Sequence, residues 1–254
     1  MVVGRGDAAM IESGPMADDD APMPSLPPVD AAAAEPMPGE VMSPELLAGL
    51  LADGDDELAA WTLTRALLDA PRADVFDGLL TDAMRLVGAR WESGQWSVAE
   101  EHLASQTLVR ALDRIRPDLG PEGRIGPLAV LAGVAGEQHM IGLVCLDQVF
   151  RERGWTVANL GADVPAADLA RFLARNEAKL VAVAASDPAR IPATMETIAA
   201  ARREAPGVPI MLGGALADVP GIAATVGADW NGRRLTDAAR YADAILDRLT
   251  VGGA

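Results

Sequence analysis

The sequence is poor in several residue types, and each shortage narrows what the protein can do. Cys145 is the only cysteine, so no intramolecular disulfide can form. Such cysteine usage suits the reducing cytoplasm, which is the expected location. Lysine and arginine number 21 against 37 acidic residues, which gives a formal net charge of −16, and Lys179 is the single lysine. Because nucleic-acid binding needs clustered basic residues, direct nucleic-acid binding is not expected.

Long apolar runs are also missing. Nowhere do about eighteen apolar residues follow one another without a charge, so we expect neither a membrane span nor a membrane partner. The first residues lack the apolar stretch of a signal peptide. Aromatic residues make up 4% of the chain, whereas half of all residues are apolar. The core must therefore consist mainly of leucine, valine, isoleucine and alanine.

Residues 1–42 differ in composition from everything that follows. They hold seven of the 18 prolines, no aromatic residue, and eight acidic residues against one arginine. Such a segment cannot bury enough apolar area to offset the entropy lost on ordering, so we predict a disordered acidic tail rich in proline and alanine. A solvating tail or a misassigned translation start is favoured over a partner-binding tail.

From Ser43 the apolar residues recur with a helical period. Ser43-Pro44-Glu45 is typical of a helix start, and Ser97-Val98-Ala99-Glu100 has the pattern of a capping box. Apolar stripes mark four helices, at about 43–51, 55–68, 73–92 and 97–115. Four amphipathic helices with short connections predict a small antiparallel bundle over 43–119, followed by a linker at 120–126.

Beyond the linker, short apolar runs alternate with amphipathic stretches. Strands are predicted at 128–134, 155–160, 179–185, 208–212 and 228–231, and helices at 140–152, 166–176, 190–204, 217–225 and 235–249. This alternation predicts an α/β fold, a doubly wound, Rossmann-like parallel sheet over 127–254. Ligands of such sheets bind at the carboxyl ends of the strands. Four motifs fall there: Glu137–His139, Gly161–Asp163, Ser186–Asp187 and Gly213–Gly214.

One of the two histidines of the chain follows the first predicted strand. His139 occupies a strand-to-helix turn, from which an imidazole can project toward a metal. Glu137 can orient that imidazole and raise its basicity, and Gly142 lets a ligand approach the helix backbone closely. On these residues alone, a metal ligand and an exposed turn histidine carry about equal weight.

Together with residues further along, this motif resembles the cobalamin-binding module of methionine synthase, corrinoid methyl carriers and cobalamin-dependent mutases. That module carries Asp-x-His-x-x-Gly, then Ser-x-Leu, then Gly-Gly. The resemblance implies that His139 is the lower axial ligand of cobalt. It also implies a base-off cofactor, whose displaced benzimidazole lies in a slot lined by Ser186, Gly213 and Gly214. Glu137 replaces the aspartate, which keeps a carboxylate on a longer side chain. Pro188 replaces the leucine, and this second replacement leaves the contact of Ser186 open.

The predicted bundle carries a second signature. Trp91, nine intervening residues and then Glu101-His102 match the Trp-x9-Glu-His pattern of the CarH type of cobalamin-binding photoreceptor, the carotenoid-gene repressors related to MerR regulators. The resemblance implies that Trp91 covers the upper face of the corrin against an adenosyl group, which Glu101 and His102 hold. The alternative is that Trp91 is bundle core and His102 a surface residue.

Two features depart from those repressors. Glu92 follows Trp91 where they carry a histidine that takes the upper cobalt position after illumination. Only the acidic tail precedes the predicted bundle, where the repressors have a DNA-binding domain, and we therefore expect the chain to act without one.

The resemblance implies a light-responsive adenosylcobalamin sensor, not an enzyme, in which photolysis of the cobalt–carbon bond changes the conformation or oligomeric state. Output would pass to a separate effector or regulator protein, or through self-association, and a bilin as second chromophore stays open. The alternative is a corrinoid methyl carrier that serves a separate methyltransferase. A carrier needs an open upper face, which Trp91 and Glu101-His102 argue against. An adaptor that no longer uses the cofactor would not need His139.

Further motifs have simpler interpretations. Gly161-Ala162-Asp163 after the second strand is either a contact to the corrin edge or a capped turn, with nearly equal weight. Trp155, Trp230 and Cys145 are expected to serve packing.

Overall fold

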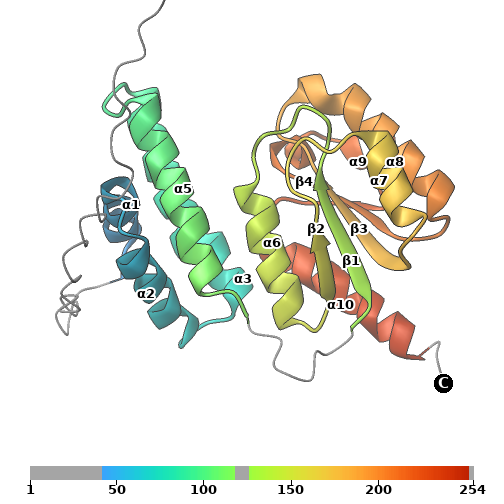
Figure 1. Cartoon of the computed structure of the whole chain (residues 1–254), viewed down its shortest axis with the longest axis horizontal. Coiled ribbons are helices and arrows are strands. Elements are labelled where there is room, and N and C mark those ends of the chain that lie inside the picture. The colour runs from blue at the N-terminus through green and yellow to red at the C-terminus, as the bar shows by residue number, and fades with distance from the viewer. Residues whose placement is uncertain (1–41, 118–125, 252–254) are drawn as a thin grey trace, which may run out of the picture. The chain divides into compact units, whose positions relative to one another are not determined.

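The predicted bundle is present in the computed structural model, which describes residues 42–117 and 126–251. Its helices are α1 (Pro44–Asp53), α2 (Asp56–Leu67), α5 (Val98–Arg114) and one segment in three parts (Figure 1). That segment runs through α3 (Arg72–Val75), the π-helical turn η1 (Phe76–Leu80) and α4 (Thr81–Glu92). The Ser43 hydroxyl caps α1, and the capping box of Ser97 and Glu100 forms with both of its hydrogen bonds. Both predicted helix starts are confirmed.

The α/β fold is also confirmed. Five parallel strands stand in the order β2-β1-β3-β4-β5. They are β1 (Leu128–Gly133), β2 (Thr156–Asn159), β3 (Ala178–Ala184), β4 (Ile210–Gly213) and β5 (Trp230–Asn231). The chain moves from β1 to one side for β2 and returns to the other side for β3. The order therefore reverses at the carboxyl ends of β1 and β3, where open α/β sheets bind their ligands.

Helices cover both faces of this sheet. They are α6 (Ile141–Glu152), α7 (Ala166–Leu173), α8 (Ile191–Glu204), α9 (Ile222–Val226) and α10 (Leu235–Val251). Side chains of β1 alternate between the two faces, as the pleat requires. Ala129 and Leu131 pack in one cluster with α6 and α10, and Val130 and Ala132 in the other with α7, α8 and α9.

One predicted helix was wrong in extent. The segment expected as a single helix at 217–225 divides into a short turn, η3 (Ala215–Asp218), and α9. Pro220 lacks the backbone N–H that a continuous helix needs, and Gly221 takes a φ of 75°, outside the helical region. The tail predicted at 1–42 and the linker predicted at 120–126 lie outside the described residues, apart from Met42 and Gly126, so those boundaries stay predictions. Within the described ranges, no helix is both long and apolar enough to cross a membrane.

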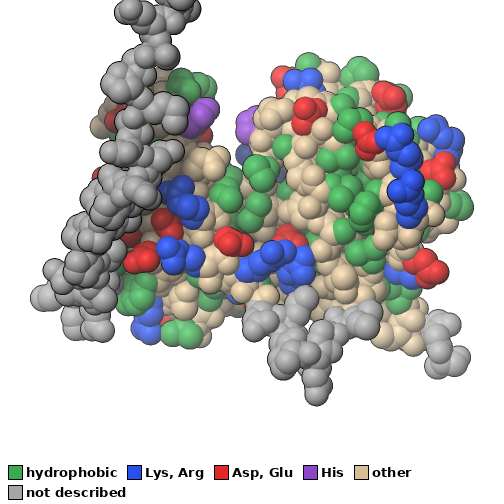
Figure 2. Space-filling view, viewed as in Figure 1, with side chains coloured by type: hydrophobic (Ala, Val, Ile, Leu, Met, Phe, Trp, Pro, Cys, Tyr) green, Lys and Arg blue, Asp and Glu red, His purple; other side chains and the backbone are tan. Residues whose placement is uncertain are grey.

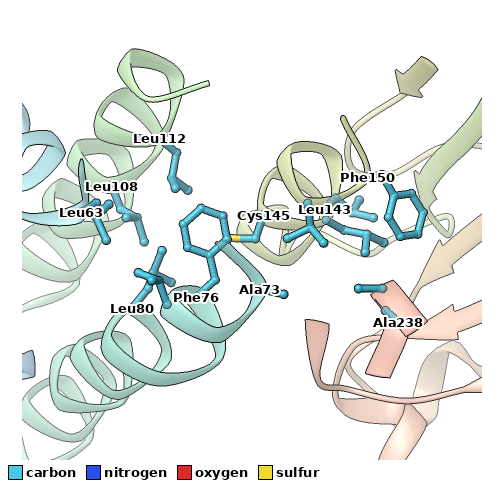
Figure 3. Packing of buried hydrophobic residues seen from close by; sticks show 14 of the residues in the cluster. Leu63, Ala73, Phe76, Leu80, Leu108, Leu112, Leu143, Cys145, Phe150 and Ala238 are labelled. Atoms are coloured by element: carbon cyan, nitrogen blue, oxygen red, sulfur yellow. The ribbon is translucent and has the colours of Figure 1, made fainter. Parts of the chain in front are cut away.

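The bundle and the sheet domain share one hydrophobic core. The cluster that contains Ala129 and Leu131 continues through α6 into the bundle. Figure 3 shows Phe76 of η1 between the leucines of the bundle and Cys145 of α6. Phe76 and Cys145 are both buried, which confirms the packing role predicted for Cys145. Burial of the thiol raises its pKa to about 12, so Cys145 is a protonated, apolar core residue.

Polar contacts reinforce this join. A guanidinium nitrogen of Arg72 in α3 donates to Gln148 Oε1 of α6 at 2.8 Å, and Gln148 Nε2 donates to the carbonyl of Leu112 in α5 at 2.6 Å. Asp77 of η1 reaches the start of α10. Its carboxylate accepts the backbone N–H of Leu235 and of Thr236 and the Thr236 hydroxyl, at 2.7–2.9 Å. The bundle thus supplies the N-terminal cap of a helix in the sheet domain.

This cap makes a testable prediction. Asp77→Ala leaves the first N–H groups of α10 without their buried acceptor, so we expect the free energy of unfolding to fall by about 1–2 kcal/mol. Urea denaturation followed by circular dichroism measures the loss. Asp82→Ala is the control, because Asp82 is a half-exposed residue paired with Arg85 on the same helix, and we expect a change within about 0.5 kcal/mol. Equal losses in both variants would contradict the capping role.

Candidate functional site

The loops that follow β1, β3 and β4 meet beside a cavity of about 510 Å³. This cavity lies between the sheet, α6, the start of α10, and η1 with α4 of the bundle. Five of the residues predicted from the sequence line it: His139, Gly142, Ser186, Gly213 and Gly214. Residues scattered over 75 positions of the sequence are therefore brought to one cavity, where the strand order reverses.

Glu137 joins two of these loops from beneath. Its side chain is 3% exposed. One carboxylate oxygen accepts the backbone N–H of His139 at 2.8 Å and lies 2.6 Å from His139 Nδ1, while the other accepts the backbone N–H of Ser186 at 2.5 Å. The carboxylate thus ties the loop after β1 to the loop after β3.

The environment of Glu137 favours its ionised form. Burial by itself raises the pKa of this carboxyl. The hydrogen bonds from the His139 backbone and imidazole and from the Ser186 N–H outweigh burial, and together they hold the Glu137 pKa below its usual value. An ionised carboxylate accepts hydrogen bonds only, so His139 Nδ1 must be the donor.

This arrangement leaves the other nitrogen of His139 available. With the proton on Nδ1, the lone pair of a neutral imidazole resides on Nε2, the state that binds metals. The His139 side chain is 81% exposed, in contrast to the buried Glu137. A buried carboxylate that orients an exposed imidazole is the usual pairing around metal-bound histidines, because it fixes the tautomer and raises the basicity of the ligand.

Two of the glycines meet opposite requirements. Gly214 has a φ of 84°, and a Cβ there would lie 2.3 Å from the carbonyl oxygen of Ala185. The close approach of the loops after β3 and β4 therefore demands glycine at this position. At Gly142, a Cβ would have no atom within 4 Å. Gly142 is thus not required by packing, and it leaves open space beside the cavity that it lines.

Asp163 braces the turn that precedes Glu137. Its carboxylate accepts the backbone N–H of Gly136 at 2.6 Å, and its own N–H donates to the carbonyl of Glu137 at 2.9 Å. Asp163 has a φ of 54°, in the left-handed region that aspartate tolerates better than most residues. Of the two interpretations of Gly161-Ala162-Asp163, the structure therefore supports a capped turn, one that steadies the loop carrying His139.

The signature residues of the bundle do not line this cavity. Trp91 lies in the last turn of α4 and Glu101-His102 in the first turns of α5, so all three are at one end of the bundle. Trp91 is 46% exposed and belongs to no hydrophobic cluster of the described residues, whereas Trp96 packs partly buried under the guanidinium of Arg90. Of the alternative interpretation, the part that made Trp91 a core residue is therefore wrong, whereas the part that made His102 a surface residue is confirmed. Glu101 lies 2.7 Å from His102 Nδ1, and the His102 side chain is 72% exposed.

A second hollow lies between the bundle and the sheet domain. It measures about 640 Å³, with residues of α5 on one side and of α6 and the loop after β2 on the other. Figure 2 shows this face of the molecule as hollowed between its two parts, with histidine side chains (purple) on both sides.

Several lining residues escaped the sequence analysis. Phe76 and Asp77 reach the cavity from η1, and Trp230, Arg233 and Arg234 reach it from the end of β5 and the loop that follows. Trp230 also stacks on Tyr241 of α10, with ring centroids 5.5 Å apart, so its predicted packing role is only part of its role. Its position at the end of the last strand was the one available signal, since strand ends on this edge face the site.

Comparison with known protein families finds a match for each part of the chain. One family, described as "B12 binding domain", matches residues 127–239, and a second family of the same description matches residues 45–116. The sheet domain and the bundle are thus each similar to a B12-binding domain family. These matches support a cobalamin cofactor, as the sequence motifs predicted.

Two curated relatives are transcriptional repressors of Myxococcus xanthus. The HTH-type transcriptional repressor CarA is 40% identical over 111 residues, which cover 42% of this chain and 36% of the repressor. The HTH-type transcriptional repressor CarH is 35% identical over 156 residues, which cover 61% of this chain and 52% of the repressor. The chain therefore spans about a third and about half of the length of these two relatives.

Corrinoid proteins are more distant relatives. Dimethylamine corrinoid protein 3 of Methanosarcina acetivorans is 24% identical over 186 residues, which cover 72% of this chain and 86% of that protein. Among solved structures, the Methanosarcina barkeri monomethylamine corrinoid protein matches with a TM-score of 0.64 at 19% identity, over 78% of this chain and 95% of that one. This likeness shows a common fold, a helical N-terminal region followed by a parallel sheet with helices.

The residues of the cavity suit a base-off cobalamin. A displaced benzimidazole is flat and largely apolar, and the walls beside Gly142 and Gly213 include Ala182, Ala184 and Met211. The volume falls within the range of about 300–1,000 Å³ that is typical of small-molecule sites. The cavity therefore combines open space beside Gly142 with the oriented imidazole of His139, which suits a flat cofactor that carries a metal.

The two glycines provide a matched pair of variants. Gly214→Ala combines a positive φ with a backbone clash, so we expect it to lower the free energy of unfolding by about 2–4 kcal/mol. Gly142→Ala adds a methyl group in open space near the start of α6, so stability should be unchanged or raised by up to about 1 kcal/mol. Thermal unfolding by calorimetry distinguishes the two. A destabilised Gly142→Ala protein would show that Gly142 serves packing rather than the cavity.

Proposed function

We propose that the protein is a light-responsive, adenosylcobalamin-binding regulator, in which His139 holds cobalt from below and Trp91 with Glu101-His102 holds the adenosyl group from above. The observation that carries this proposal is the buried Glu137 carboxylate, which orients an exposed His139 beside an apolar cavity. The relation to the repressors CarA and CarH supports a regulator.

On the lower side, each residue has a distinct part. His139 presents Nε2 to the metal, and Glu137 fixes the tautomer and keeps the ring from rotating. The cavity beside Ser186, Gly213 and Gly214 would hold the benzimidazole of the cofactor when His139 binds the metal. Ser186 lines the cavity and donates its backbone N–H to Glu137. The same carboxylate would therefore position both the wall beside the benzimidazole and the imidazole of His139.

On the upper side, the exposed indole of Trp91 offers a flat apolar surface to an adenine ring. Glu101 and His102 form a polar pair on the neighbouring helix, suited to the hydroxyl groups of a ribose. When bound, the cofactor supplies a cobalt–carbon bond that light can break. Loss of the adenosyl group would leave Trp91 without its partner, and the bundle would repack against the sheet domain between discrete arrangements.

The second candidate is a corrinoid methyl carrier. The family relation to dimethylamine corrinoid protein 3 and the common fold favour it. A carrier must expose the upper face of cobalt to a separate methyltransferase, and an indole with a polar pair at that face would obstruct docking. The relation to the two repressors is also higher in identity. Output through a separate regulator protein or through a second copy of the chain therefore fits better.

Substitution of His139 tests the lower ligand. His139→Ala removes the one histidine of the sheet domain, so we expect the visible spectrum of bound adenosylcobalamin to lose the features of histidine ligation. His102→Ala is the matched control and should keep them. Identical spectra for His139→Ala and the parent protein would remove the basis of the assignment.

Substitution of Trp91 tests the upper face. Trp91→Ala should keep the histidine-ligated spectrum but weaken the preference for adenosylcobalamin over methylcobalamin by about 0.5–1.5 kcal/mol, the usual contribution of aromatic stacking. Trp61→Ala on α2 is the control, because Trp61 is exposed to a similar degree and lines neither cavity. Equal losses of affinity for both cofactors would assign Trp91 a structural role.

The regulatory part of the proposal is tested by light. Small-angle X-ray scattering and size-exclusion chromatography of the adenosylcobalamin-loaded protein should change after green light, whereas the hydroxocobalamin-loaded protein should not respond. An unchanged adenosyl form that transfers methyl groups to an added acceptor enzyme would favour the methyl carrier instead.

A further inference from the structure

Three arginines gather at the mouth of the cavity that contains His139. Arg85 comes from α4 of the bundle, and Arg233 and Arg234 come from the loop between β5 and α10. All three side chains are more than half exposed, whereas the apolar residues deeper in the cavity are buried. Such a gathering stands out in a chain with a net charge of −16.

The carboxylates near Arg233 and Arg234 already accept hydrogen bonds from other groups or engage only part of each guanidinium. Asp77 is the one acidic residue among those that line the cavity. Both of its oxygens accept hydrogen bonds from the start of α10, and Arg234 Nε lies 3.6 Å from it, beyond hydrogen-bond distance. Arg233 binds Asp218 at 2.9 Å, through one of its terminal nitrogens. Arg234 therefore has guanidinium N–H groups that Asp77 does not engage. Asp218 engages one terminal nitrogen of Arg233, which leaves the other N–H groups of this guanidinium for a ligand.

A base-off cobalamin brings an anion to this cavity. Its benzimidazole is attached through a ribose and a phosphodiester, which carries one negative charge. The apolar interior beside Ala182, Ala184 and Met211 can hold the base, but an unpaired phosphate there would suffer a large desolvation penalty. The phosphodiester must therefore stay at the mouth, where guanidinium groups, the usual partners of phosphate, are present.

The geometry points to Arg233 and Arg234 as residues that recognise the nucleotide-loop phosphodiester, and so select complete corrinoids over those that lack the nucleotide loop. This inference rests on the proposed cobalamin site, and it adds a determinant of corrinoid specificity. Arg85 lines the same cavity from the bundle and would add a third guanidinium group near the phosphodiester.

The test compares two corrinoids and two variants. Hydroxocobalamin carries the phosphodiester, whereas cobinamide lacks the nucleotide loop altogether. Binding of each is measured by isothermal titration calorimetry for the full chain, for the double variant R233Q/R234Q and for R240Q. Arg240 is the control because it is an exposed arginine of α10 that pairs with Asp237 and does not line the cavity.

We expect R233Q/R234Q to weaken hydroxocobalamin binding about three- to tenfold and to leave cobinamide binding unchanged. The loss should shrink at high salt, because exposed charges are screened. R240Q should change neither affinity. A double variant that lowers both affinities equally, or neither, would overturn the phosphodiester assignment while the cobalamin site stands. If the parent protein binds hydroxocobalamin no better than cobinamide, the proposal that the cavity binds the benzimidazole tail is itself wrong.

Discussion

The Glu137 carboxylate is the contact on which the arrangement of the site depends. It lies in the interior and accepts hydrogen bonds from the loop after β1 and from the loop after β3, the two strands between which the strand order reverses. A buried carboxylate is costly unless its oxygens are hydrogen-bonded, and here both are. The imidazole of His139 is therefore held in one orientation, and the same carboxylate ties together the two loops that border the cavity.

The second constraint is the join between the bundle and the sheet domain. The turn η1 carries Phe76 into the shared core and Asp77 onto the start of α10, and both residues also line the cavity. A ligand in the cavity would thus contact the residues that hold the bundle in place. In the proposed regulator, this contact connects the state of the cofactor with the position of the bundle. The turn η1 that carries these two adjacent residues is π-helical, and π-helical turns are frequent at functional sites.

The sequence predicted the fold well because its signals are local. Capping motifs at Ser43 and Ser97 and the period of the apolar residues placed the helices, and continuous apolar runs placed the strands. The divided helix near Pro220 was missed because the apolar period continues across Pro220, which lacks a backbone N–H, and Gly221, which adopts a positive φ. His139, Gly142, Ser186, Gly213 and Gly214 could be assigned to one site, since strand ends share an edge.

Contacts between distant residues could not be predicted in the same way. Nothing in the local pattern shows that Asp77 caps a helix 158 positions later, or that Asp163 supports the turn at Gly136. Trp230 begins a strand of two residues, and Arg233 and Arg234 lie in the loop after it, where no motif in the sequence marks them as part of the site. These roles depend on tertiary packing, which brings side chains together irrespective of their spacing in the chain.

The central claim is that Nε2 of His139 binds the cobalt of a base-off cobalamin. Electron paramagnetic resonance of the protein loaded with cob(II)alamin tests it most directly, because a nitrogen bound axially to cobalt splits the signal. Protein labelled with nitrogen-15 in its histidines should change each line from a triplet to a doublet, and His139→Ala should abolish this change while His102→Ala retains it. A signal that keeps its triplets in the labelled protein would mean that the benzimidazole of the cofactor, and not His139, binds the metal.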